Sequence, residues 1–273
     1  MFGKKNKPLK RPGISVVMSV YNGEKYLQQS IDSIINQSFS DYEFIIINDG
    51  SIDNTQQILE ECAKKDSRVK IINHNNVGLT KSLNIGIKNA ASNLIARQDA
   101  DDISLINRLT LQYDLMQSSI DTVLCGSNGI NRYEPLGREV SIPSKISNDN
   151  IHEKLFFKNP FAHTSVMFRK CIFNEVGGYD EKFVRSQDFE LWMRMSARGR
   201  LHYFDEPLVV RRVHDGMVTR NFNMEQFKCT LKARMMNYHK NYFMLIKYTA
   251  LDLLMMSTPR VVKELVKKFI TKL

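Results

Sequence analysis

The sequence predicts an α/β fold in which a mostly parallel sheet is flanked by helices. In the first hundred residues, short apolar runs rich in valine and isoleucine alternate with segments whose apolar residues recur at helical spacing. The apolar runs are continuous, which is typical of strands buried on both faces. Strands and helices that alternate at this pace indicate βαβ units and a parallel sheet.

The elements of the first half follow from these two patterns. The clearest helical stripe is formed by Leu27, Ile31, Ile34 and Ile35. We expect strands at 14–20, 43–48, 69–73 and 94–98, and helices at 24–37, 54–65 and 81–91.

The second half mixes shorter elements, and the conformation of 128–160 stays open. Helix 186–199 is the clearest, with Leu191, Trp192 and Met195 on its apolar side and Gly199 as a stop signal. We also expect a strand at 162–169, a short helix from 171 to the glycine pair 177–178, and strands at 201–204 and 207–214.

The length of 273 residues suits one large domain with an appendage. We divide the chain into a basic flexible tail (1–12), a catalytic domain (13–222) and a basic helical C-terminal segment (223–273). The formal charge of +10 gathers at the two ends and favours an anionic surface, either membrane or nucleic acid.

Other features of composition concern the cellular compartment. The four cysteines lie far apart, which argues against a zinc site or a disulfide framework and fits a reducing cytosol. The N-terminus has no apolar signal core, so secretion is not expected. The apolar stretch 243–256 is too short for a membrane span and contains Lys247 and Asp252.

Polar segments follow three of the expected strands, at 19–24, 48–54 and 98–102. Ligands of open α/β sheets bind beyond the carboxyl ends of the strands, so these segments should share one rim. The side chains placed there are Tyr21, Asn22, Asp49, Asp99, Asp101 and Asp102.

Three of these rim residues, Asp99, Asp101 and Asp102, are carboxylates that crowd one turn. Hard divalent cations prefer several carboxylate oxygens, which favours Mg²⁺ or Mn²⁺. We expect such an ion to offset the repulsion of the acids for one another and for a diphosphate. The alternative is that the acids cap a following helix.

Several separated motifs together resemble family 2 glycosyltransferases. They occur in order as SVVMSVYNGEKYLQQSIDSIINQSFSDYEFIIINDGS, ARQDADD, GGYDEKFVRSQDFELWMR and RRVH, within residues 14–215. The resemblance implies the GT-A (nucleotide-diphospho-sugar transferase) fold. It also implies inverting transfer of a sugar from a nucleotide-sugar, by family habit a UDP-sugar, to a hydroxyl of a glycan or lipid-linked glycan in cell-surface polysaccharide biosynthesis.

The resemblance assigns the nucleotide to loops of the first half. Asp49 would accept a hydrogen bond from uracil; its alternative is a turn residue before Gly50. Tyr21 and Asn22 would contact the nucleotide, and Asn22 also suits helix capping. Asp99 would approach the ribose.

Three further donor-side residues are implied in the same way. The segment GLTKSLNIG (78–86) resembles the family segment beside the uridine, although Leu83 stands where many members have arginine. Lys81 is a substitute cation there, and Asn84 matches the pattern. Arg97 would stack on or bond to the base, or alternatively balance the charge of the acids.

By the same resemblance, Asp101, Asp102 and His214 would bind the Mn²⁺ or Mg²⁺ ion, although a lone histidine is also often structural. Asp188 would be the general base, with Gln187 where the family has a second acid. Its alternative is a helix-capping group. His163 would line the acceptor side, or serve as a core hydrogen-bonding group.

The last residues form a basic amphipathic pattern at 258–273. It favours an anionic membrane surface over packing on its own domain or on a second subunit, and we expect a cytoplasmic enzyme that is peripheral on the inner face of the membrane. The oligomeric state stays open.

Two other functions compete with the glycosyltransferase. A sugar-nucleotide pyrophosphorylase usually needs a glycine-rich, basic phosphate loop after its first strand, which SVYNGEKYL lacks. A basic nucleic-acid-binding or scaffold protein would explain the net charge but not the acids on the rim, which repel phosphates, so no nucleic-acid partner is expected.

Overall fold

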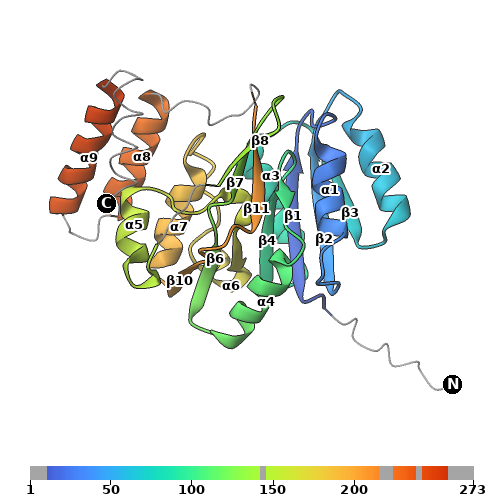
Figure 1. Ribbon diagram of the computed structural model, residues 1–273, viewed down its shortest axis with the longest axis horizontal. Coiled ribbons are helices and arrows are strands. Elements are labelled where there is room, and N and C mark those ends of the chain that lie inside the picture. The colour runs from blue at the N-terminus through green and yellow to red at the C-terminus, as the bar shows by residue number, and fades with distance from the viewer. Residues whose placement is uncertain (1–10, 142–145, 215–223, 238–241, 258–273) are drawn as a thin grey trace.

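The structure is a computed structural model that describes residues 11–141, 146–214, 224–237 and 242–257. Its central sheet has the strand order β10-β6-β9-β4-β1-β2-β3 and lies between two layers of helices (Figure 1). The strands are β1 (Ile14–Val20), β2 (Tyr42–Asp49), β3 (Val69–His74), β4 (Leu94–Asp99), β6 (Thr122–Gly126), β9 (Met167–Arg169) and β10 (Arg200–Tyr203).

A smaller sheet with the order β5-β11-β7-β8 adjoins the central one. Its strands are β5 (Ile103–Ser104), β7 (Ile130–Tyr133), β8 (Arg138–Ser141) and β11 (Val209–Val213). The pairing of β5 with β11 brings the chain that follows the acidic turn beside the strand that leads to His214. Residues about 110 positions apart thereby become neighbours.

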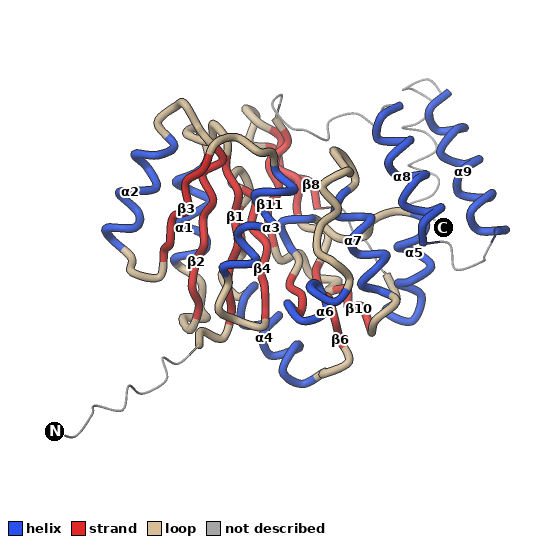
Figure 2. Tube along the Cα trace, turned by 180° about the vertical axis from the view of Figure 1, so that it is seen from behind, coloured by secondary structure: helices blue, strands red, loops and turns tan. Residues whose placement is uncertain are grey.

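Helices cover both faces of the central sheet (Figure 2). The described helices are α1 (Leu27–Ile35), α2 (Thr55–Lys65), α3 (Leu79–Asn89), α4 (Arg108–Ser118), α5 (Ile151–Phe157), α6 (Lys170–Glu175), α7 (Gln187–Ser196), α8 (Met224–Asn237) and α9 (Tyr242–Ser257). Helix α8 packs on α7, and α9 lies beyond α8 at one flank of the protein. Short 3₁₀ turns lie at Asn148–Asn150 and His163–Ser165.

Strand β1 shows how the core is divided. Val16 and Met18 pack in the cluster that contains Leu27 and Ile31 of α1, whereas Val17 packs in the cluster on the other face. This alternation buries each side chain completely, and each such burial stabilises the fold by roughly 1.5–3 kcal/mol.

The close packing of α3 on the sheet depends on Gly86. A Cβ atom at this position would lie 2.4 Å from Cδ1 of Ile47 and 2.7 Å from Cγ1 of Val17. The helix therefore sits at a distance from the sheet that only glycine permits.

The expected strands and helices of the first half are confirmed with small shifts of their ends. The strand predicted at 162–169 is shorter: His163–Ser165 form a 3₁₀ turn, and only Met167–Arg169 pair with the sheet, antiparallel to β4. The prediction missed α4, α5 and the strands β5 to β8, which are short or carry weak periodicity.

The C-terminal part is helical in α8 and α9, as expected. The basic segment 258–273 and residues 1–10 of the tail lie outside the described residues, and the division into three parts stays a prediction. Among the helices that the structure describes, none is long and apolar enough to cross a membrane.

Candidate active site

The carboxyl ends of four strands are level with one another. The strand register pairs Ser19 of β1 with Asp99 of β4, Val20 of β1 with Asn48 of β2, and Asp49 of β2 with His74 of β3. From β1 the chain adds β2 and β3 on one side, and it then crosses to place β4 on the other side of β1. Open α/β sheets bind ligands at such a switch point between neighbouring strands. The acidic turn follows directly from this switch point.

Asn22 joins the loop after β1 to the loop after β2. Its backbone N–H donates to Oγ of Ser51 at 3.0 Å, and its Oδ1 accepts from the N–H of Ile52 at 2.9 Å. The capping alternative is wrong, because α1 begins at Leu27 and has no side-chain cap. Tyr21 beside it is half exposed on the rim.

Asp49 is buried at the end of β2, and its two oxygens are engaged by the loop after β3. Oδ1 accepts from the N–H of Val77 at 2.8 Å and Oδ2 from that of Gly78 at 3.0 Å. Nδ1 of His74 lies 3.4 Å from Oδ1. Gly50 follows with a φ of 75°, which fits the turn alternative. Asp49 thus fixes the loop after β3, and its contact with uracil stays a prediction.

Asn84 of α3 ties down the loop after α6. Its amide donates to the carbonyl of Tyr179 at 3.0 Å and to Oε1 of Glu181 at 3.2 Å, while its Oδ1 accepts from the N–H of Tyr179 at 3.1 Å. The contacts therefore give Asn84 a positioning role. Lys81 is exposed on the same helix, and its phosphate contact stays a prediction.

Arg97 is almost completely buried, with 2% of its surface exposed, and pairs with Asp99 at 2.5 Å. Burial raises the pKa of Asp99, but the Arg97 guanidinium outweighs it and holds that pKa below its usual value. This geometry fits the charge-balancing alternative for Arg97. A guanidinium so buried cannot present its face to a base without a rearrangement.

Asp101 and Asp102 have different surroundings. Oδ1 of Asp102 accepts from the backbone N–H of Arg212 at 2.9 Å, and the side chain is buried. Burial, then the charges of Asp99 and Asp101, raise its pKa well above the ordinary value. Asp101 is more exposed and lies 3.0 Å from Nε2 of His214; burial and the Asp99 charge raise the pKa of Asp101.

The acidic turn is also supported from beneath by buried polar side chains. Gln98 donates to the carbonyl oxygen of Asp102 at 2.9 Å and accepts from Arg108 at 3.0 Å. Arg108 is fully buried and also donates to the carbonyl of Arg97 at 2.6 Å. Arg212 donates to the carbonyl of Asp101 at 2.5 Å.

These contacts correct the expectation that a cation alone offsets the repulsion of the acids. Three buried arginines, Arg97, Arg108 and Arg212, supply positive charge around the turn. The pKa values of Asp101 and Asp102 remain raised, first because both groups are removed from water and then because the acids repel one another.

The residues present fit a divalent cation that is shared with a ligand. Asp101 and His214 meet at the exposed side of the turn, and a carboxylate beside an imidazole is a suitable pair of ligands for such an ion. In the described part of the chain, no three His, Cys, Asp or Glu side chains are arranged to hold a metal by themselves. The remaining ligands would therefore come from phosphate oxygens or water.

Asp188 lies in the first turn of α7 but does not cap it. The residue at the N-cap position is Ser186, and the helix has no side-chain cap, so the capping alternative is wrong. Oδ2 of Asp188 instead accepts from the Asn159 amide at 2.7 Å. The acidic turn is tied to the 3₁₀ turn that carries His163, because the backbone N–H of Asp99 donates to Oγ1 of Thr164 at 3.1 Å.

His163 and Tyr179 form a hydrogen-bonded pair in the interior of the protein. Nε2 of His163 and the hydroxyl of Tyr179 are 2.7 Å apart, and both rings pack edge-on against Trp192. Burial, with Arg97 nearby, lowers the pKa of His163 to about 4, so the imidazole is neutral at pH 7. The core hydrogen-bonding alternative thus describes His163, and a place on the acceptor side stays a prediction.

Sequence reasoning missed Asn159 and Arg211. Asn159 precedes Pro160 in a loop, and only the tertiary contact with Asp188 reveals its role. The charge of Arg211 helps to lower the pKa of Asp99 and offsets part of the rise in the pKa of Asp102. Its neighbour Arg212 is buried. The alternation of side chains along a strand could have separated these two arginines.

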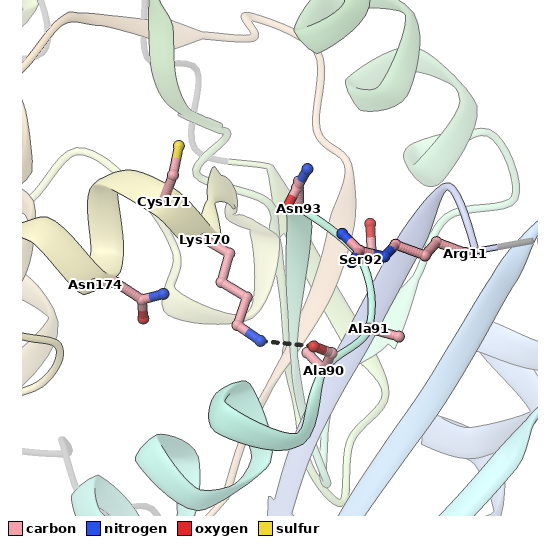
Figure 3. Close-up of a pocket in the computed structure, with 8 residues that line it drawn as sticks. All are labelled: Arg11, Ala90, Ala91, Ser92, Asn93, Lys170, Cys171 and Asn174. Atoms are coloured by element: carbon pink, nitrogen blue, oxygen red, sulfur yellow. Dashed lines mark hydrogen bonds between the residues drawn. The ribbon is translucent and has the colours of Figure 1, made fainter. Parts of the chain in front are cut away.

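A surface cavity of about 510 Å³ lies elsewhere (Figure 3). It is next to the amino end of β4, where Nζ of Lys170 donates to the carbonyl of Ala90 at 2.6 Å. The carboxyl end of β4 carries the acidic turn, so this cavity and the turn lie at opposite ends of the strand. Its lining residues are Arg11, Ala90, Ala91, Ser92, Asn93, Lys170, Cys171 and Asn174.

Comparison with known proteins gives consistent matches. The family model described as glycosyl transferase family 2 matches residues 15–177. The O-antigen biosynthesis glycosyltransferase WbnJ of Escherichia coli is 38% identical over 184 residues, which cover 67% of this chain and 71% of WbnJ.

Solved structures show the same fold at low identity. S. aureus TarS 1-349 in complex with UDP-GlcNAc has a TM-score of 0.69 and 17% identity, covering 86% of this chain and 71% of that one. The chain spans 39% of a longer TarS chain. The mannosyltransferase PcManGT from Pyrobaculum calidifontis, in complex with GDP-Man and Mn²⁺, has a TM-score of 0.62 and 14% identity, covering 97% and 83%.

Proposed function

The chain is a GT-A-fold member of glycosyl transferase family 2, and from this premise we propose that it is an inverting, hexosyltransferase-type enzyme. It moves a sugar from a nucleotide-sugar to a hydroxyl of a glycan or lipid-linked glycan in cell-surface polysaccharide biosynthesis. The observation that supports this most is the acidic turn at the carboxyl end of β4, beside β1, with Asp101 3.0 Å from His214. The family membership decides the enzyme class against a pyrophosphorylase.

The donor binds beyond the carboxyl ends of β1 to β4 in this proposal. The loops that carry Tyr21, Asn22 and Asp49 hold the nucleotide, and Asp99 faces the ribose. UDP is the nucleotide favoured by the family resemblance. The two structural neighbours were solved with different nucleotides, UDP-GlcNAc and GDP-Man, so the fold alone leaves the base open.

Asp101 and His214 would hold a Mn²⁺ or Mg²⁺ ion, and Asp102 would add a more buried carboxylate from the same turn. When bound, the ion would offset the negative charge of the diphosphate as it leaves. Arg211, on the strand that leads to His214, adds positive charge near Asp99 and suits the same phosphates.

Asp188 acts as the general base. Its carboxylate takes the proton of the acceptor hydroxyl as that oxygen bonds to the anomeric carbon, and the bond from this carbon to the diphosphate breaks on the opposite side. The positive end of the α7 dipole favours negative charge at this position. Asn159 orients the carboxylate through its hydrogen bond to Oδ2.

The polysaccharide role is supported by the identity with WbnJ. Lipid-linked acceptors are extended at the cytoplasmic leaflet, and we place the enzyme there as a peripheral protein. The predicted localisation depends on the lysine-rich segment 258–273, which lies outside the described residues.

A screen of UDP-, GDP- and dTDP-sugars tests the proposal. The expected result is that one nucleotide-sugar raises the melting temperature and is hydrolysed slowly, and that both effects depend on Mn²⁺ or Mg²⁺. NMR of the product with an accepted glycan should show inversion at the anomeric carbon. If no nucleotide-sugar stabilises the protein or is cleaved, the proposal fails.

A further inference from the structure

Helix α9 directs its one carboxylate, Asp252, toward the protein. Asp252 pairs with Arg234 of α8 at 2.5 Å, and Tyr248, one turn earlier on the same side, is 7% exposed. Arg234 is itself 1% exposed and also donates to the carbonyls of Phe156 and Phe157 at the end of α5. These contacts fix which side of α9 faces the protein.

The outward side of α9 is apolar. Phe243, Ile246 and Leu254 are 76%, 68% and 62% exposed, and Tyr242 and Leu253 are exposed as well. At 100° per residue these five side chains lie within an arc of about 120° on one side of the helix. We call them the α9 face.

This arrangement is the reverse of an ordinary surface helix. In α1, the apolar Leu27, Ile31 and Ile34 are completely buried. In α9 the buried ion pair is inside and the large apolar groups are outside. Figures 1 and 2 show α9 as the outermost helix at its flank, with α8 between it and the body of the protein. Contiguous exposed apolar side chains of this size mark an interaction surface.

We propose that the α9 face docks on a membrane that contains anionic lipids. Lys247 is exposed at the edge of the face, and the sequence that directly follows α9 contains five basic residues and one acid: Arg260, Lys263, Lys267, Lys268 and Lys272 against Glu264. Anionic headgroups complement that charge. The net positive charge of that sequence would oppose the approach of a second copy of the chain.

The mode of binding is interfacial. No helix among the described residues is suited to span a bilayer, so α9 would lie along the surface with its apolar side chains inserted below the headgroups. The inference deepens the location given in the proposed function and rests on it. It makes no use of the sugar-transfer chemistry.

Flotation of the full chain with vesicles tests the inference, using phosphatidylcholine with 30% phosphatidylglycerol and phosphatidylcholine alone. The wild-type protein should float with the anionic vesicles. The double variant Phe243→Glu/Leu254→Glu should lose at least about 10-fold in binding, because two charges enter the apolar face. The milder pair Ile246→Gln/Leu253→Gln should weaken binding less.

The matched control is Ile120→Glu/Leu136→Glu, which changes two apolar residues elsewhere that are even more exposed, at 87% and 84%. It should bind vesicles as the wild type does. Equal flotation of the α9 variants and the wild type, or equal binding to neutral vesicles, would overturn the inference. So would a wild-type dimer in light scattering that the α9 variants convert to monomer, because the occupant would then be a second copy.

The assay also separates this inference from the proposed function. Donor hydrolysis in solution should be unchanged in the α9 variants. A protein that floats but cleaves no nucleotide-sugar would refute the chemistry alone, and one that cleaves the donor but never floats would refute the docking alone.

Discussion

The amide of Asn159 donates a 2.7 Å hydrogen bond to Oδ2 of Asp188. Asn159 is fixed in turn, because its Oδ1 accepts from the N–H of Phe161 at 3.1 Å. A loop that follows α5 therefore orients a carboxylate on α7. The two residues of this pair are 29 positions apart in the chain.

Replacement of Asp188 by Asn should abolish transfer and keep donor binding. The amide has nearly the same shape but cannot take a proton, so we expect kcat to fall by about 10²–10⁴. Calorimetric titration with the nucleotide-sugar should give an unchanged Kd. Turnover near the wild-type rate would remove Asp188 from the mechanism.

Asn159→Ala should lower kcat by about 10-fold or more, because a hydrogen bond to a charged group is worth roughly 1.5–3 kcal/mol. The KM for the donor should stay the same, since the contact positions the base and not the nucleotide. Asn159→Gln should recover part of the rate. A rise in the donor KM with unchanged kcat would contradict this role.

Asp101→Asn should weaken metal activation. With one carboxylate removed, we expect the Mn²⁺ concentration for half-maximal donor hydrolysis to rise by at least about 10-fold. His214→Ala should raise it as well. As a control, Asp149→Asn changes an exposed acid far from the turn and should leave the metal dependence unaltered. Identical metal titrations for the wild type and Asp101→Asn would refute the site.

The neutral His163 should make the fold sensitive to acid. Its pKa in the folded state is about 4, below its ordinary value of 6.5, so the unfolded state binds more protons between these two pH values. The free energy of unfolding should therefore fall as the pH drops from about 6.5 to about 4.

His163→Gln removes this titration and should flatten the pH dependence by up to about 1.4 kcal/mol per pH unit. Urea unfolding at several pH values between 4.5 and 7 measures the two slopes. Parallel curves for the two proteins would show that His163 does not contribute.

Arg234→Met should loosen α9 from the protein. The change leaves the carboxylate of Asp252 and the carbonyls of Phe156 and Phe157 without their donor, and breaking a buried ion pair costs about 3 kcal/mol or more. Thermal unfolding measures the loss. The double variant Arg234→Met/Asp252→Leu should regain part of it, because it removes both charges. No change in melting temperature would contradict the tie.

Much of the architecture could be predicted because its signals are local. Continuous apolar runs such as 14–20 and 43–48 specify strands buried on both faces, and parallel connections bring their carboxyl ends to one edge. The common rim of Asn22, Asp49 and Asp99 follows from that topology. The resemblance to the family could also be found in the sequence, because it depends on the order of the motifs along the chain. Short or weakly periodic elements such as α4 and β6 carried too little local signal.

The sequence by itself determined the class of fold, the acidic turn and the edge at which it lies, because periodicity and chain order encode all three. Only the tertiary structure decided what each polar side chain touches. It buried Arg97 against Asp99, engaged Asp49 with the loop after β3, and gave Asp188 its partner Asn159. It also turned Asp252 inward to Arg234 and left the apolar side of α9 outside. Such choices depend on contacts between distant segments, which no local pattern specifies.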